Sequence, residues 1–285
     1  MERRHKMEGQ TAFVTGAAHG IGKAVGQALV EAGARVVFAD CDEAGVQRAV
    51  EGGVNREIER ARAEVLDVSK EEAFFELVNR VESEWGPIDV LVNNAAVMDI
   101  VRFDGADRER IRQQLEVNLG GTLNGMAAVL PQMVARGSGH VVNMGSIAGQ
   151  TAIPYVATYA ATKNAIAALT EAIRSELRGT GVALTCILPG QVETRLLAGA
   201  GSPRLIPRAT VEQVATATLK AIRNKPARVY VPGSLRFAAA LPYVLPQFAV
   251  DAIARFLRSD TMYRSPDPEE RAPYDNASWW EPGRQ

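Results

Sequence analysis

The sequence predicts an α/β fold, a doubly wound parallel sheet of about seven strands with helices on both faces. Short apolar runs rich in β-branched residues alternate with helix-length stretches along most of the 285 residues. The runs are too continuously hydrophobic for strands with one solvated face, and such continuity is typical of strands covered on both faces. Repeated alternation of strand and helix indicates parallel strands joined by right-handed crossovers.

The expected elements alternate as far as residue 231. Strands are expected at 11–15, 35–40, 63–66, 89–93, 140–145, 182–188 and 228–231. Helix-length stretches lie between them, at 20–32, 70–85, 107–135, 155–178 and 211–224. Ser69 followed by Glu72 has the spacing of a capping box, which predicts that the helix over 70–85 starts beside Ser69.

We expect one domain followed by an extension. No stretch rich in Gly, Pro or Ser interrupts the chain before residue 189, so we expect a single domain over 9–233, preceded by an arm at 1–8. Eight of the 14 prolines fall in 226–285. Residues 234–285 are therefore expected to form a Pro-rich extension with little long regular structure.

The composition argues against several classes of protein. The 32 basic and 33 acidic residues give a net charge of −1, which provides no global field to hold a nucleic acid. Only two cysteines occur, which rules out a disulfide framework and favours a reducing, cytoplasmic location. The histidines and cysteines lack the spacing of a zinc site. No run is long and apolar enough to span a membrane, and residues 1–10 lack the apolar stretch of a signal peptide.

A glycine-rich turn follows the first expected strand. The sequence Thr15-Gly-Ala-Ala-His-Gly-Ile-Gly22 leads directly into a helix. Its glycines allow a sharp turn and a close approach of backbone amides to a phosphate, and the helix N-terminus offers unpaired N–H groups to a pyrophosphate. Asp40 ends the second strand 18 residues after Gly22, near the distance expected for a carboxylate that binds the adenosine ribose. The alternative is a tight turn without a ligand.

Asp40 also favours NAD over NADP. A carboxylate can accept hydrogen bonds from both ribose hydroxyls but repels a 2′-phosphate. The residues that follow it, Cys41 to Glu43, supply no cation to neutralise that phosphate. One alternative stays open, because Arg48 could reach back from the next helix.

The helix near residue 155 carries Tyr159 and Lys163, four positions apart. Residues at this spacing share a helix face, so the phenol and the ammonium are expected to point into one cleft. A neighbouring cation favours phenolate and lowers the phenol pKa, which would let the tyrosine take a proton from an alcohol while hydride leaves its carbon. Tyr155 has no lysine four residues on, so we do not expect it to be the base.

Taken together, these motifs resemble those of the short-chain dehydrogenase/reductase family, in its subgroup of about 250 residues with a T-G-x-x-x-G-x-G loop. The resemblance rests on the glycine loop, Asn93-Asn94-Ala95-Ala96, Ser146 and Tyr159-x-x-x-Lys163, and it covers residues 9–231. It implies a Rossmann fold and an oxidoreductase that acts on CH–OH groups with a nicotinamide cofactor. It also implies a homodimer or homotetramer built through the helices near 107 and 155.

The resemblance assigns roles to individual residues. Tyr159 would be the general acid/base, Lys163 would hold the nicotinamide ribose, Ser146 would hydrogen-bond the substrate oxygen, and Asn118 would bend its helix and hold a relay water. The implied cofactor-binding residues are Gly16, His19, Gly20, Ile21, Gly22, Asp40, Asp67, Val68, Asn93, Asn94, Ala95, Tyr159, Lys163, Pro189, Gly190, Val192 and Thr194. Two positions depart from the family pattern, Ala96 where glycine is usual and His19 in the loop, and His19 could contact a phosphate or face solvent.

Each assignment has a structural alternative. Ser146 could be a helix cap, Asn118 could fill a kink, and Asp67 could cap a helix together with Ser69. Asn93 and Asn94 could form a plain turn. The functional reading is favoured because the structural one would need several coincidences in the right order.

The segment 190–209 is expected to be a lid over an apolar substrate. It carries Leu196, Leu197, Leu205 and Ile206 among glycines that would make it mobile. The residues Met98, Ile147, Ile153, Tyr155 and Val156 are expected to line the same cleft without adding charge. We therefore expect a lipophilic secondary alcohol or ketone of the steroid, terpenoid or cyclic-alcohol type. The alternative is that these residues simply pack.

Two further hypotheses concern the extension and the reaction. Residues 237–250 carry no charge and could cover the cleft, contact a subunit, or rest on a membrane surface through 236–258. Trp279 and Trp280 are expected to anchor the tail on a neighbouring subunit or to be disordered. An alternative function is a catalytically silent NAD-sensing module of the same fold. An epimerase or dehydratase that uses NAD internally is disfavoured, because the tail is too short for a substrate domain.

Overall fold

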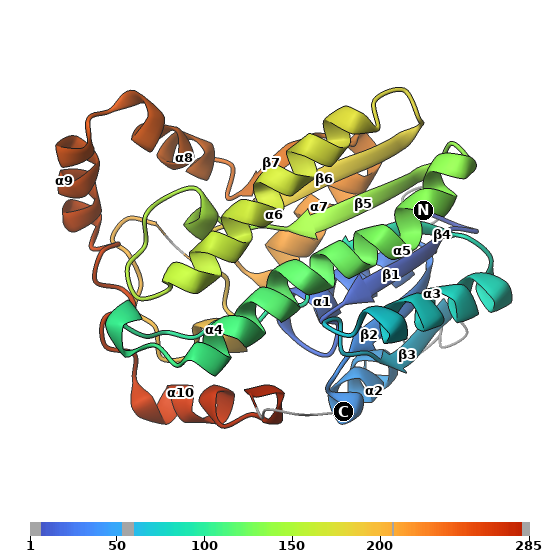
Figure 1. The fold of residues 1–285 in the computed structure, drawn as a ribbon, viewed down its shortest axis with the longest axis horizontal. Coiled ribbons are helices and arrows are strands. Elements are labelled where there is room, and N and C mark those ends of the chain that lie inside the picture. Colours follow the sequence, from blue (N-terminus) through green and yellow to red (C-terminus); the bar gives the residue numbers. More distant parts are fainter. Residues whose placement is uncertain (1–6, 53–59, 207, 281–285) are drawn as a thin grey trace.

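The computed structural model describes residues 7–52, 60–206 and 208–280. Its centre is one parallel sheet of seven strands in the order β3-β2-β1-β4-β5-β6-β7 (Figure 1). The strands are β1 (Thr11–Thr15), β2 (Arg35–Asp40), β3 (Ala61–Val65), β4 (Ile88–Asn93), β5 (Gly139–Met144), β6 (Val182–Pro189) and β7 (Arg228–Val231). Every neighbouring pair is parallel, which confirms the predicted doubly wound fold.

Helices cover both faces of the sheet because alternate strand residues point to opposite sides. In β1, Ala12 and Val14 belong to one apolar core, whereas Phe13 belongs to the other. The first core packs under α1 (Gly20–Glu31), α2 (Glu43–Glu51) and α7 (Val211–Asn224). The second packs under α3 (Glu71–Trp85), α5 (Gly121–Ala135) and α6 (Ala157–Glu176). Both strand faces are therefore apolar, as the continuous runs predicted.

The start of α3 differs from the prediction. The N-cap residue is Lys70, without a side-chain cap, and Ser69 does not cap the helix. The Ser69 hydroxyl donates instead to the Asp67 carboxylate at 2.7 Å, and that carboxylate also accepts the Ser69 amide at 3.0 Å. The capping-box prediction is wrong because the hydroxyl is engaged by a carboxylate two residues back.

The stretch expected as one helix over 107–135 is interrupted. It consists of α4 (Arg108–Gln114), a π-helical turn at Leu115–Gly120, and α5. The buried Asn118 lies within this turn. A π-helical turn widens the helix by one residue, which changes the direction of the side chains that follow.

The Pro-rich extension contains more helix than the composition suggested. It forms α8 (Leu235–Val244), α9 (Gln247–Leu257), α10 (Pro268–Asp275) and a 3₁₀ turn at Ser278–Trp280. Helix α10 begins with a proline, which has no N–H to leave unpaired, and is capped by Asp267. The helices are short, and none in the described part of the chain is long and apolar enough to cross a membrane.

Phe74 on α3 tests the packing of this helix against the sheet. Its ring is fully buried and stacks on Phe13 with centroids 5.6 Å apart. Phe74→Ala should lower the free energy of unfolding by about 3–5 kcal/mol, because a buried aromatic is lost and a cavity remains. Urea denaturation measures the change. The matched control is Phe103→Ala at an exposed position, which should change stability by about 0.5 kcal/mol or less. Equal losses in the two variants would contradict the described core.

Candidate active site

A cavity of ≈ 360 Å³ opens at the carboxyl ends of the strands. Strand β1 has β2 on one side and β4 on the other, so the order of the strands reverses between β1 and β4. Such a switch point is where open α/β sheets bind ligands. Its lining runs from Gly16 after β1, through the ends of β2, β4 and β5, to the extension.

The glycine-rich turn holds the ends of β1 and β4 together. Gly16 has φ +64°, and a Cβ there would lie 2.8 Å from Ala95 Cα and from Asn94 Nδ2. The Asn94 side chain donates to the carbonyls of Thr15 and Gly16, at 3.0 and 3.1 Å. Only glycine allows this approach, which leaves the backbone of the turn facing the cavity.

Two predicted cofactor-binding residues do not line the cavity. A Cβ on Gly22 would lie 2.1 Å from the Gly16 carbonyl oxygen, so this glycine serves the packing of α1 against the turn. Asn93 is buried within the sheet, where its Nδ2 donates to Asn143 Oδ1 at 2.9 Å. Its amide ties β4 to β5 rather than facing a ligand. The other implied cofactor-binding residues line the cavity.

Asp40 lies where a ribose-binding carboxylate was expected. Its Oδ2 accepts the Ala18 amide at 2.9 Å and its Oδ1 accepts the Asp42 amide at 3.0 Å. These bonds fix the carboxylate at the edge of the cavity. On the neighbouring strand connection, Asp67, Leu66 and Val68 line the same side.

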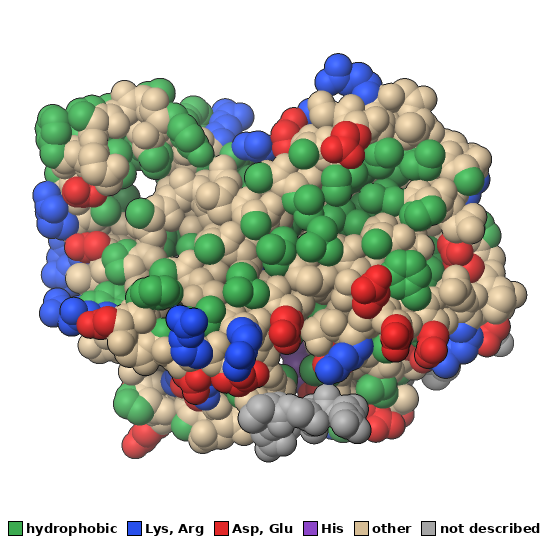
Figure 2. Space-filling model, viewed as in Figure 1, with side chains coloured by type: hydrophobic (Ala, Val, Ile, Leu, Met, Phe, Trp, Pro, Cys, Tyr) green, Lys and Arg blue, Asp and Glu red, His purple; other side chains and the backbone are tan. Residues whose placement is uncertain are grey.

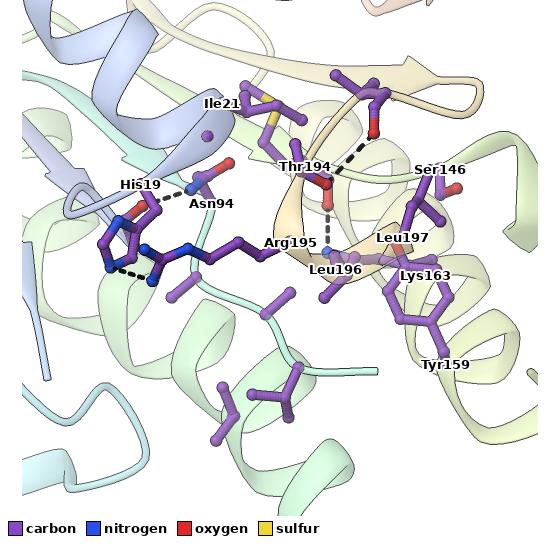
Figure 3. Close-up of a pocket in the computed structure, with 18 of the residues that line it drawn as sticks. His19, Ile21, Asn94, Ser146, Tyr159, Lys163, Thr194, Arg195, Leu196 and Leu197 are labelled. Atoms are coloured by element: carbon purple, nitrogen blue, oxygen red, sulfur yellow. Dashed lines mark hydrogen bonds between the residues drawn. The ribbon is translucent and has the colours of Figure 1, made fainter. Parts of the chain in front are cut away.

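His19 and Arg195 meet across the mouth of the cavity. His19 Nε2 lies 2.7 Å from Asp42 Oδ2, and Arg195 Nη1 lies 3.1 Å from the same nitrogen (Figure 3). Burial raises the pKa of Asp42, but hydrogen bonds from His19 and the Gly45 amide outweigh it and lower the pKa overall. Sequence reasoning missed Arg195, whose signal was a basic residue directly before Leu196 and Leu197.

Ser146, Tyr159 and Lys163 converge on the cavity from two elements. Ser146 follows β5, and its hydroxyl accepts the Ala148 amide at 3.1 Å. Tyr159 and Lys163 lie one turn apart on α6, and both are buried (Figure 3). The expected shared helix face is therefore present.

The pKa of Tyr159 departs from the expectation. Burial raises it above its usual value, and the nearby Tyr263 raises it further, whereas a hydrogen bond with Ser146 lowers it. The expected net lowering by Lys163 is not found among these protein groups. The ammonium lies 5.6 Å from the centre of the phenol ring and donates to the Met144 carbonyl at 2.8 Å. Burial lowers the pKa of Lys163 to about 8.

Asn118 supports this cluster through hydrogen bonds to the Val97 backbone and to Thr162, next to Lys163. Its side chain closes two bonds with the Val97 backbone, accepting from the amide at 2.8 Å and donating to the carbonyl at 2.9 Å. Its Nδ2 also lies 3.2 Å from the hydroxyl of Thr162, the neighbour of Lys163. Asn118 does not line the cavity, so it connects the loop after β4 to α6 through the π-helical turn.

The expected apolar residues divide into two groups. Ile147, Ile153, Leu196 and Leu197 line the cavity. Met98, Tyr155 and Val156 do not, and instead pack behind it in one apolar cluster with Tyr159. Leu205, expected to face the substrate from the lid, is 82% exposed. Among the described residues of the segment 190–209, only the first part, as far as Leu197, thus faces the cavity.

The extension forms a wall of the cavity that sequence reasoning missed. Met262, Tyr263, Tyr274 and Trp279 line it. Trp279 and Trp280 pack with Tyr274 and Val97 of the same chain, so these residues are placed by contacts within the chain rather than disordered, and the expected anchor on a neighbouring subunit stays a prediction. The feature of the sequence that could have indicated this wall is the pair of adjacent tryptophans, because large aromatic side chains are usually buried.

Arg271 fastens this wall to the cavity. It is buried on α10, and its Nη1 and Nη2 donate to the carbonyls of Leu196 and Met98, at 2.7 and 2.6 Å. Its Nε donates to Asp275 at 3.0 Å. One guanidinium therefore joins the extension, the loop after β6 and the loop after β4.

Comparison with known proteins agrees with this geometry. The sequence model of the short chain dehydrogenases matches residues 10–204. The chain belongs to this family. The predicted family is confirmed, and the protein is an oxidoreductase of this type.

Relatives of this short chain dehydrogenase carry several names. An uncharacterized oxidoreductase of Myxococcus xanthus is 35% identical over 257 residues, which cover 89% of this chain and 99% of the relative. A sorbitol dehydrogenase of Cereibacter sphaeroides is 38% identical over 190 residues, 66% of this chain and 72% of that protein. The 17-beta-hydroxysteroid dehydrogenase 13 of Rattus norvegicus is 29% identical, covering 89% and 85%.

A solved structure shares the fold. The crystal structure of a short chain dehydrogenase/reductase from Burkholderia phymatum in complex with NAD has a TM-score of 0.76. It is 23% identical and covers 84% of this chain and 94% of its own. The likeness supports the Rossmann-type architecture.

Lys163 gives a prediction for the pH dependence of stability. Its pKa falls from the ordinary 10.5 to about 8 on folding, so the unfolded chain binds more protons between these values and wild-type stability gains as the pH rises through them. Below about pH 8 folding buries a charged ammonium. Lys163→Met should therefore raise the free energy of unfolding at pH 7 by about 2 kcal/mol, and this advantage should shrink toward pH 10.5.

Urea denaturation of wild type and variant at several pH values measures this difference. Lys220→Met, on the exposed face of α7, is the matched control and should show no such pH dependence. An advantage of Lys163→Met that stays constant with pH would contradict the lowered pKa.

Proposed function

We propose that this protein is an NAD-dependent oxidoreductase that transfers hydride between nicotinamide and a lipophilic secondary alcohol or ketone. The steroid, terpenoid and cyclic alcohols are the substrate types we favour. The observation that carries the proposal is the convergence of Ser146, Tyr159 and Lys163 on the cavity that also contains the glycine-rich turn. Binding groups for a dinucleotide and proton-transfer groups for an alcohol thus share one space.

The residues present fit a dinucleotide. Helix α1 begins directly after the turn, its N-cap residue His19 provides no side-chain cap, and its first turn holds no acidic residue. The N-terminal amides and the positive end of the helix dipole are thereby left for an anion such as a pyrophosphate. Gly20, with φ +52°, keeps side-chain atoms away from this position.

NAD rather than NADP is the proposed cofactor because Asp40 lines the cavity near the glycine-rich turn, where the adenosine ribose would lie. Its carboxylate can accept hydrogen bonds from ribose hydroxyls and would repel a 2′-phosphate. Arg48 affects the pKa of Asp42, so it lies near enough to act on this region. Arg48 interacts electrostatically with the opposite charge of Asp42. Asp40 is therefore left as the group that discriminates between the two cofactors.

Asp40→Ala tests the cofactor preference. Removal of the carboxylate should weaken use of NAD and remove the repulsion of a 2′-phosphate. We expect the ratio of kcat/KM for NAD to that for NADP to fall about 100-fold, which corresponds to about 2.7 kcal/mol. Steady-state kinetics with each cofactor measures it. An unchanged ratio would show that another group sets the preference.

An apolar substrate is supported by the lining beside Ser146. Ile147, Ile153, Leu196, Leu197 and Met262 present aliphatic side chains to the cavity. Arg195, which also lines the cavity, is directed to His19 instead. Apolar walls with a few polar groups at the reacting end are typical of sites for lipophilic ligands.

The proposed mechanism moves a proton through Tyr159. Bound nicotinamide supplies the acceptor or donor for hydride. In oxidation the phenolate form of Tyr159 accepts the substrate hydroxyl proton, and Ser146 hydrogen-bonds the substrate oxygen where charge develops. In reduction the phenol donates. Burial raises the pKa of this phenol, which favours the protonated form that donates to a ketone oxygen.

Lys163 and Asn118 are positioning residues in this proposal. The Lys163 ammonium would hold the ribose hydroxyls next to Tyr159 and release its bond with the Met144 carbonyl to do so. Asn118, through Val97 and Thr162, would keep this part of α6 in place and hold a relay water.

Tyr159→Phe tests the proton transfer. The variant should lose about a thousandfold in kcat, while the Kd for NAD changes by about twofold or less. The assay follows formation of reduced nicotinamide with a panel of lipophilic alcohols, and calorimetry gives the Kd. Tyr155→Phe, a neighbouring tyrosine outside the cavity, is the matched control and should keep its activity. Turnover retained by Tyr159→Phe would exclude this residue as the acid/base.

We further propose a homodimer or homotetramer in the cytoplasm. Leu115 in the π-helical turn and Leu123 and Val134 on α5 are exposed, which supports an interface along these helices. The cytoplasmic location is supported by a sequence with only two cysteines.

A further inference from the structure

Helices α8 and α9 form an arm, residues 235–258, at one end of the molecule (Figure 1). Helix α9 contains no buried residue, and α8 buries only Leu235 and Ala239. Val250, Ile253 and Leu257 lie on one face of α9 and are half-buried.

The opposite faces of both helices carry large apolar side chains. On α9, Phe248, Ala252 and Phe256 follow one another at intervals of four and form one stripe; the two phenylalanines are 75% and 64% exposed. On α8, Phe237, Tyr243 and Val244 are equally exposed. Five large hydrophobic side chains are thereby presented to the outside within 20 residues of sequence.

Positive charge accompanies these side chains. Residues 234–264 contain four arginines and two aspartates, although the chain as a whole has a net charge of −1. Arg236 stands over the ring of exposed Phe237 at 4.7 Å, and Arg255 is exposed next to Phe256. Figure 2 shows apolar and basic side chains gathered along this edge of the molecule. Of the two aspartates, Asp251 is engaged by Gln247 at 2.8 Å.

We propose that the arm docks on the surface of an anionic lipid bilayer. Exposed aromatic side chains insert at the boundary of headgroups and acyl chains, and neighbouring arginines pair with lipid phosphates. The charge argues for this occupant, because an excess of arginine among exposed aromatics complements a negative lipid surface. Pro246 separates the two short helices, and Pro242 lies within α8, so the arm lies on the surface and does not span it.

The arm is continuous with the cavity wall. Its last residues lead into Met262 and Tyr263, which line the cavity. The Leu257 carbonyl accepts the amide of Arg204 at 2.7 Å, and the Met262 carbonyl accepts that of Gly201 at 2.8 Å. Docking would therefore hold the loop after β6 against a lipid surface, where lipophilic alcohols concentrate. The docking itself does not depend on the proposed activity.

Vesicle flotation of the full-length protein tests the docking. Vesicles of phosphatidylcholine alone are compared with vesicles of phosphatidylcholine and phosphatidylserine. We expect binding to the mixed vesicles that weakens with added salt. Phe248→Ser with Phe256→Ser should lower the partition coefficient by about tenfold or more, and Arg255→Gln by about fivefold.

Controls separate docking from misfolding and from self-association. Phe103→Ser removes an exposed phenylalanine outside the arm and should bind vesicles like the wild type. Thermal unfolding should be similar in all variants, since the substituted side chains are exposed. Light scattering reports the oligomeric state. Absence of binding to the mixed vesicles, binding unaffected by the arm substitutions, or an oligomer that the arm substitutions dissociate without any vesicle binding would each overturn the proposal.

Discussion

The close approach of β1 and β4 at their carboxyl ends is the constraint on which the site depends. The absence of a side chain at Gly16 and the two bonds donated by Asn94 bring the ends together. Because β5 and β6 continue the sheet in parallel from β4, their ends reach the same edge. Ser146, which follows β5, and the loop after β6 are thereby placed opposite the glycine-rich turn. A wider separation would divide the cavity into unrelated halves.

Burial sets the electrostatics of the pair formed by Tyr159 and Lys163. It raises the pKa of the Tyr159 phenol and lowers that of the Lys163 ammonium, so each group is pushed toward its neutral form. The sequence suggested the opposite for the tyrosine, because the spacing reveals the neighbouring cation but not the loss of solvent. Two groups biased toward neutrality respond strongly to any charge that enters the site.

The fold could be predicted to a large extent, because strand and helix periodicity arises from local burial. The strand ends located Asp40 and Ser146 correctly at the cavity. Errors came where side chains compete for one partner. Ser69 had the spacing of a cap but binds Asp67, and Asn93 lies beside Asn94 yet points into the sheet. The cavity wall at 262–279 could not be predicted, since Arg271 recognises backbone carbonyls, which every sequence possesses.

The guanidinium of Arg271 has a consequence for how the protein is made and diversified. The segment that carries it follows every strand of the sheet along the chain, so it is translated after the sheet and the glycine-rich turn. The chamber's outer wall is also encoded apart from the chemistry it encloses. Insertions or exchanges there can reshape what is admitted while the proton-transfer machinery is inherited intact.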